Sequence, residues 1–206
     1  MKKLAAFCAA LFTWLALAPV AANAAATDPL PHFTVHLLSA NGSGCPPGST
    51  AVSQASDSEF TVTYSQYIAD AGDGAGPLDF RKNCQLNVSV GVPGGWTFGI
   101  SAVDYRGYAH LGNSAQGTLS ASYYYAGLPA TYRQQHSIYG VTDGDYEFTD
   151  QAPIVAWAPC HFTTTLNVNT ELRAYRGSDP SDLSVLTMDS TDVNMSTIYQ
   201  LTFREC

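Results

Sequence analysis

Polar and aromatic residues gather in one short run of this sequence, Asp104-Tyr105-Arg106-Gly107-Tyr108, with His110 close behind. A carboxylate and an imidazole that meet in a pocket can act as general acid and base. Asp104 and His110 would then be the centre of a secreted hydrolase. The tyrosines suggest a different chemistry, because exposed rings beside polar groups stack on sugars or anchor a partner protein. The run therefore supports both a catalytic and a binding hypothesis.

A second group of aromatic residues follows at Tyr123 to Tyr125. Strands favour tyrosine and rings fill the cores of β-sandwiches, so part of this content is expected to be structural. We expect Arg106 to pair with Asp104 or to stack on a ring. The candidate ligand-binding residues are Tyr105, Arg106, Tyr108, Tyr123, Tyr124 and Tyr125.

No catalytic residue is assigned from a motif. The Gly-x-Ser-x-Gly elbow of serine hydrolases is absent, and Gly42-Ser43-Gly44 and Gly112-Asn113-Ser114 both miss its spacing. Carboxylate pairs of glycoside hydrolases meet in space and not in sequence, so that possibility stays open.

Two groups of residues could contribute ligands to a metal ion, but we expect neither a metal nor a cofactor. His32 and His36 face the same side of a strand, but no further ligands accompany them. Oxygen-rich loops suit extracellular calcium, although turn chemistry explains the same residues and the EF-hand spacing is missing. The aspartates of these loops are Asp70, Asp73, Asp143, Asp145, Asp179 and Asp182.

The N-terminus predicts export. Lys2 and Lys3 precede an apolar run from Leu4 to Val20, and Ala22-Asn23-Ala24 fits a cleavage site, so residues 1–24 are expected to be a signal peptide. After its removal no membrane span is expected.

The mature chain then has seven basic against seventeen acidic residues, a net charge of about −10. This acidic balance argues against nucleic acid and anionic membranes as partners. We expect the protein to be extracellular or periplasmic.

Four cysteines remain in the mature chain: Cys45, Cys84, Cys160 and Cys206. An even number in an exported protein indicates two disulfides, and three connectivities are possible. We favour Cys45–Cys84 and Cys160–Cys206, which join neighbours along the chain. Each closed loop would stabilise the fold by about 4 kcal/mol in the chain-entropy model.

Strands must position all these side chains. Apolar residues alternate with polar ones in several runs, and no window after the signal has a helical period. We predict an all-β fold, an antiparallel β-sandwich in a single domain. It comprises a loose leader and first strand over 25–39 and the main domain over 40–206. The Asp104–Tyr108 run is expected at a strand end, and residues 126–150 are expected to be irregular. The alternating runs are 33–37, 60–64, 84–92, 96–102, 119–125 and 162–172.

Several short blocks carry a resemblance to a known family. They are Gly42-Ser-Gly-Cys-Pro46, Arg81-Lys-Asn-Cys-Gln-Leu86, Asp104-Tyr-Arg-Gly-Tyr-Ala109, Ala158-Pro-Cys160 and Arg204-Glu-Cys206. With these blocks the chain resembles the secreted family called domain of unknown function 4360, from about residue 40 to the end. The resemblance implies a small exported protein with paired cysteines, and it implies no activity.

The sequence is therefore compatible with three functions. We favour a non-enzymatic exported domain that binds a polysaccharide or a cell-surface protein through the tyrosines named above. The alternatives are a hydrolase that uses carboxylate or histidine chemistry and a purely structural extracellular protein.

Overall fold

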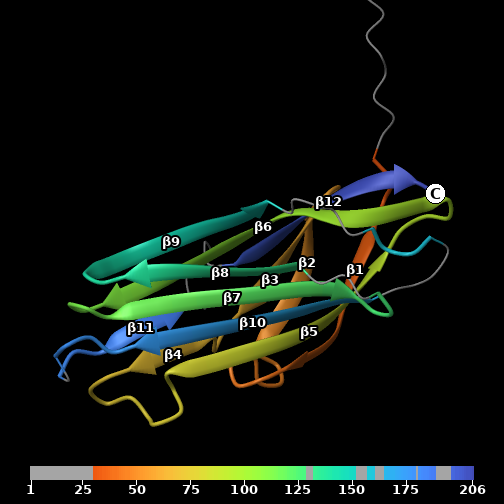
Figure 1. Ribbon diagram of the computed structural model, residues 1–206. Coiled ribbons are helices and arrows are strands. Elements are labelled where there is room, and N and C mark those ends of the chain that lie inside the picture. The colour runs from red at the N-terminus through yellow and green to blue at the C-terminus, as the bar shows by residue number, and fades with distance from the viewer. Residues whose placement is uncertain (1–29, 129–131, 152–156, 161–164, 180, 189–195) are drawn as a thin grey trace, which may run out of the picture.

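A computed structural model of the protein describes residues 30–128, 132–151, 157–160, 165–179, 181–188 and 196–206. These residues form two antiparallel sheets that pack face to face, which confirms the predicted β-sandwich (Figure 1). The predicted signal peptide and residues 25–29 of the leader lie outside the described residues. Within those residues, no helix has the length and apolar character that a membrane crossing requires.

One sheet has five strands in the order β1-β5-β10-β7-β8. Apolar residues alternate with polar ones along its central strands, so one face is buried and the other faces solvent. Four of its strands lie side by side in Figure 1, in the order that the hydrogen bonding gives. The bounds are β1 Thr34–Asn41, β5 Arg81–Gly91, β10 Thr165–Tyr175, β7 Gln116–Tyr125 and β8 Tyr132–Tyr139.

The second sheet has seven strands, organised around the long strand β6 (Trp96–Leu111). One edge of β6 pairs first with β12 (Thr197–Glu205) and then with β11 (Ser184–Thr187), and its other edge pairs with β9 (Thr142–Gln151). The sheet is completed by β2 Thr50–Ser56, β3 Glu59–Tyr64 and β4 Ile68–Ala71.

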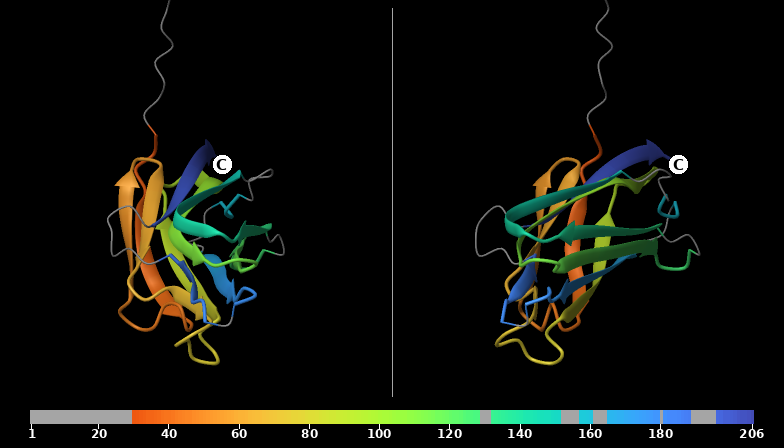
Figure 2. Two further views of the ribbon diagram at one scale, coloured as in Figure 1. Left: turned by 90° about the vertical axis from the view of Figure 1, so that its left-hand side faces the viewer. Right: turned by 60° about the vertical axis from the view of Figure 1, so that its left-hand side comes forward.

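The core lies between the two sheets, which Figure 2 shows from the side. Aromatic rings fill much of it. Phe60 stacks on Tyr199 with 4.7 Å between ring centroids, and Tyr64 meets Tyr67 edge to face at 5.1 Å. The Tyr67 hydroxyl donates a hydrogen bond across the sandwich to Thr170 Oγ1 at 3.0 Å. Burial of these rings removes a large apolar area from water and fixes the two sheets together.

Two predictions about strand boundaries were wrong. The Asp104–Tyr108 run does not end a strand, because β6 continues through it to Leu111. Residues 126–150 are not irregular, because β8 and β9 occupy most of them. Both are edge strands, and their inward positions include residues that are not apolar, Gln134 on β8 and Gly144 and Asp150 on β9, so a clean apolar alternation is missing there.

Both favoured disulfides are present. Cys45–Cys84 ties the loop after β1 to β5, and both of its cysteines are buried. Cys160–Cys206 ties the last residue to the segment that precedes β10. The choice of sequence neighbours from three connectivities is confirmed.

Candidate functional site

Of the six residues predicted to bind a ligand, five tyrosines and one arginine, three lie in the core. Tyr105, Tyr123 and Tyr125 point between the sheets and are almost fully buried. Their predicted role on an exposed surface is therefore wrong. The reason is position: each falls on the inward phase of its strand, where a large ring is more stable in the core than in water.

The other face of β6 carries the remaining polar residues of the run. Arg106 donates to Glu147 of β9 at 2.9 Å, and the Tyr108 hydroxyl donates to Asp143. His110 also contacts Asp143, and the hydrogen bonds from Tyr108 and His110 hold the pKa of that carboxyl below its usual value. These side chains therefore already bind one another along the pair of strands.

The structure keeps Asp104 and His110 apart. Asp104 accepts hydrogen bonds from Thr149 Oγ1 at 2.6 Å and Gln200 Nε2 at 2.9 Å. The two residues face the same way on β6 but are six positions apart, which is about 20 Å along a strand. They cannot share one reacting group, so the geometry of the proposed hydrolase centre is missing.

The residues considered for a metal site, which we did not expect to form one, do not come together either. Asp179 accepts hydrogen bonds from the backbone and the hydroxyl of Ser181, which is turn chemistry. Within the described part of the chain, no three His, Cys, Asp or Glu residues gather closely enough to hold an ion.

A different surface has the shape of a binding site. The outer face of the five-stranded sheet contains a hollow of about 590 Å³, which we call the polar hollow. Four strands contribute to it: β5, β10, β7 and β8. The outward side chains that line it are Arg81, Asn83, Gln85, Ser120, Ser122, Arg133, Gln135, Asn169 and Glu171.

Strand register brings these side chains into rows across the sheet. Gln85 lies opposite Asn169, which lies opposite Ser122, which lies opposite Arg133. The next row contains Asn83, Glu171, Ser120 and Gln135. Neighbouring strands are about 4.8 Å apart, so the four strands present polar groups over a width of about 14 Å.

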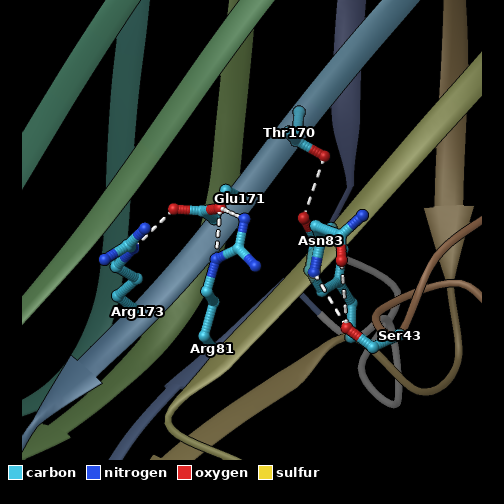
Figure 3. A network of polar contacts seen from close by, with 7 residues as sticks. Ser43, Arg81, Asn83, Thr170, Glu171 and Arg173 are labelled. Carbon is cyan, nitrogen blue, oxygen red and sulfur yellow. Dashed lines mark hydrogen bonds and ion pairs between the residues drawn. The ribbon is translucent and has the colours of Figure 1, made fainter.

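One wall of the polar hollow is an ion network on β5 and β10 (Figure 3). Glu171 accepts from Arg81 Nε at 2.6 Å and from Arg173 Nε at 2.5 Å. Burial alone would raise the pKa of Glu171, but its hydrogen bonds with Arg173 and Arg81 and their charges outweigh this and hold the pKa below its usual value. Glu171 is thus a carboxylate shared by two guanidinium groups.

Hydrogen bonds hold other side chains of this face in place. Ser43, in the loop after β1, donates from Oγ to Asn83 Oδ1 at 3.2 Å and accepts from the Asn83 backbone N–H at 3.2 Å (Figure 3). Asn87 donates to Ser39 on β1, also at 3.2 Å. Side chains that are ordered before a ligand arrives lose less entropy on binding.

Tyrosine rings lie beyond both ends of the polar hollow. Tyr124 is half-buried on the outer face of β7, two residues beyond Ser122. At the other end, Tyr139 and Tyr175 lie opposite Gln116 from either side. They are 67% and 41% exposed. The outer face therefore combines a polar centre with aromatic ends.

Sequence reasoning identified Tyr124 but missed the polar hollow. The available signal was the outward phase of two strands, where Asn and Gln are frequent at residues 83–87 and 167–169. That phase predicts exposure. It does not predict that β5, β10, β7 and β8 lie together, because their pairing connects distant parts of the chain.

Comparison with known proteins assigns the chain to a family. The model of the family described as Domain of unknown function (DUF4360) matches residues 31–206. The chain belongs to this family. The resemblance drawn from its cysteine and Asp-Tyr-Arg-Gly-Tyr-Ala blocks is confirmed.

A protein from the fungus Arthroderma benhamiae, named "Uncharacterized secreted protein", is 33% identical to this chain over 177 residues. The match covers 84% of this chain and 72% of the fungal protein. The protein is secreted, as its sequence predicted, and its two disulfides suit an oxidising compartment.

Among solved structures, the chain is similar to TmCBM61, solved in complex with β-1,4-galactotriose. The two share 11% sequence identity, with 84% of this chain and 88% of that chain covered, and the TM-score is 0.25. A similarity this weak supports no conclusion about what the present protein binds.

Proposed function

We propose that the protein is a non-enzymatic secreted protein that binds a polysaccharide chain in the polar hollow. The observation that carries this proposal is a hollow on an exposed sheet face, lined by amide, hydroxyl and guanidinium side chains. Its volume of about 590 Å³ lies in the range of small-molecule sites. Such sites are usually mostly apolar, so a polar lining favours a ligand rich in hydroxyl groups.

Amide side chains suit sugar hydroxyls well. The side chain of Asn or Gln has both donor and acceptor groups, and a hydroxyl can also act in either role. Gln85, Asn169 and Gln135 on three strands can therefore bind hydroxyls that point in different directions. Protein interfaces, in contrast, usually have an apolar centre, which this face lacks. A polysaccharide thus fits better than a partner protein.

The aromatic ends suit an extended ligand. Tyr124 is eight positions along β7 from Gln116, which lies beside Tyr139 and Tyr175. This is about 27 Å along a strand, several times the size of one sugar ring. Rings at both ends can stack on sugars of the same chain. Of the predicted binding residues, the proposal includes Tyr124, and it does not use Arg106 or Tyr108, which lie on the other sheet.

The polar hollow lacks the parts for glycoside hydrolysis. Such enzymes generally place two carboxyl groups on either side of the bond that is cleaved. Among the described residues that line the polar hollow, Glu171 is the one carboxylate, and it is bound to two arginines. A carboxylate held in its charged form in this way is a poor general acid. Binding is therefore better supported than catalysis.

The test is retention of the purified mature protein on a panel of neutral and acidic polysaccharides, followed by calorimetry on any that retain it. A Gln85→Ala/Asn169→Ala double variant and a Tyr124→Ala variant should each bind about tenfold more weakly. Tyr108→Ala and Thr61→Ala, on the other sheet, are the matched controls and should bind as the wild type does. No retention on any polysaccharide, or equal losses in variants and controls, would overturn the proposal.

A further inference from the structure

We infer that the polysaccharide bound in the polar hollow is acidic, with carboxylate groups on successive sugars. This inference rests on the proposed function and adds the charge of the ligand. The evidence is the net charge of this face of the sheet, which is positive although the net charge of the whole chain is negative.

The chain is strongly acidic, with nine Lys and Arg against seventeen Asp and Glu. At the polar hollow the balance is reversed. Arg81 and Arg133 line it, and Arg173 adjoins it through the shared Glu171. Three arginines against one glutamate leave a local net charge of about +2, on a chain whose net charge is −8 with the predicted signal peptide and about −10 without it. An anionic ligand would be attracted to this face and repelled by most of the remaining surface.

Arg133 is the residue best placed to bind such a ligand. It is exposed on β8, at the edge of the sheet, and has no ion-pair partner among the described residues. It closes the row that begins with Gln85 and Asn169. A guanidinium group matches the planar carboxylate with two parallel hydrogen bonds, which neutral hydroxyls cannot reproduce.

The positions of the arginines favour a polymer over a single anion. Arg133 on β8 and Arg81 on β5 are separated by three strand spacings, about 14 Å, and also lie in different rows. One carboxylate cannot reach both. A chain with a carboxylate on each sugar can place one at each arginine, with its hydroxyl groups on the amides between them.

Glu171 should weaken this binding. It is the one carboxylate among the described residues that line the polar hollow, and it occupies Arg81 and Arg173. A Glu171→Gln substitution keeps the side-chain shape and removes the charge. It should therefore strengthen binding of an acidic chain, an effect that damage to the fold would not imitate.

The experiment compares polygalacturonate with its fully methyl-esterified form, which has the same backbone without charge. We expect the acid form to bind about tenfold more tightly, and the difference to shrink as salt is raised. Arg133→Ala should weaken binding of the acid form about tenfold and leave the ester unchanged. Glu171→Gln should strengthen binding of the acid form. Arg106→Ala removes an exposed arginine of the other sheet and is the matched control, expected to bind as the wild type does.

The outcomes separate this inference from the proposed function. If the ester binds as tightly as the acid, or if Glu171→Gln weakens binding of the acid, the inference fails and polysaccharide binding stands. If neither form is retained but a neutral polysaccharide is, the inference again fails alone. If no polysaccharide of either charge is retained, both fail.

Discussion

His136 Nε2 lies 2.6 Å from Asp150 Oδ1, and this contact joins β8 at the edge of one sheet to β9 at the edge of the other. The His136 ring also stacks on Phe148 of β9, with 4.4 Å between the ring centroids and an angle of 8°. The Asp150 side chain is almost fully buried. Asp150 of one sheet thus contacts His136 of the other, at a side of the sandwich where the edge strand of each sheet lies.

Removal of His136 should destabilise the fold. In a His136→Ala variant the buried Asp150 carboxyl loses its hydrogen-bond partner, and we expect the free energy of unfolding to fall by about 3 kcal/mol. Urea unfolding followed by tryptophan fluorescence measures this. Gln135→Ala, an exposed neighbour that points outward, is the control and should change stability by no more than about 0.5 kcal/mol. An equal effect in both variants would show that the contact contributes little.

The same carboxyl should affect how stability depends on pH. Burial raises the pKa of Asp150 above its usual 3.8, although the hydrogen bond and charge of His136 oppose this rise. The folded protein therefore keeps this proton in a pH range where the unfolded chain has released it. In that range, which begins near pH 3.8 and extends upward, the contribution of Asp150 to stability falls as pH rises.

An Asp150→Asn variant lacks this titration. We expect the free energy of unfolding of the wild type, minus that of the variant, to decrease from about pH 3 to the folded-state pKa of Asp150. Carboxyls with lowered pKa, such as Glu171, contribute with the opposite sign, but they are present in both proteins and cancel in the difference. A difference that rises over this range would contradict the prediction.

Gly107 of the Asp-Tyr-Arg-Gly-Tyr-Ala block should tolerate no side chain. A Cβ atom there would lie 2.0 Å from the backbone oxygen of Thr187, which accepts a hydrogen bond from the Tyr146 hydroxyl at 2.9 Å. Gly107→Ala must push β11 away from β6, and we expect a loss of about 3 kcal/mol in thermal or urea unfolding. Gly144→Ala on neighbouring β9 has no atom within 4 Å of the new Cβ. This control should be within about 0.5 kcal/mol of the wild type.

The two disulfides should differ in how easily they are reduced. Cys45 and Cys84 are buried, whereas Cys206 is exposed at the end of the chain. Under mild reductant without denaturant, Cys160 and Cys206 should become alkylated first, as peptide mass spectrometry can show. A Cys160→Ser/Cys206→Ser variant should lose about 4 kcal/mol, the value expected for a closed loop of this length. Earlier alkylation of Cys45 and Cys84 would contradict the assignment of the accessible bridge.

The sequence by itself determined the local structure and the compartment. Period-2 alternation predicted strands wherever a strand has one buried and one solvated face, as in β5, β7 and β10. The even cysteine count and the export signal predicted a secreted, disulfide-bonded domain. Alternation failed at β8 and β9, because polar or small residues take several of their inward positions, Gln134 and His136 on β8 and Gly144 and Asp150 on β9.

Only the tertiary structure decided which residues meet. Alternation shows that Tyr123 and Tyr124 face opposite ways, but tyrosine suits both core and surface, so the pattern does not say which ring is buried. The polar hollow depends on strands from residues 81, 116, 132 and 165 onward that pair in the order β5-β10-β7-β8. That strand order is set when the apolar faces of all the strands are buried together in one core. It is a property of the whole packed chain, and no single segment carries it.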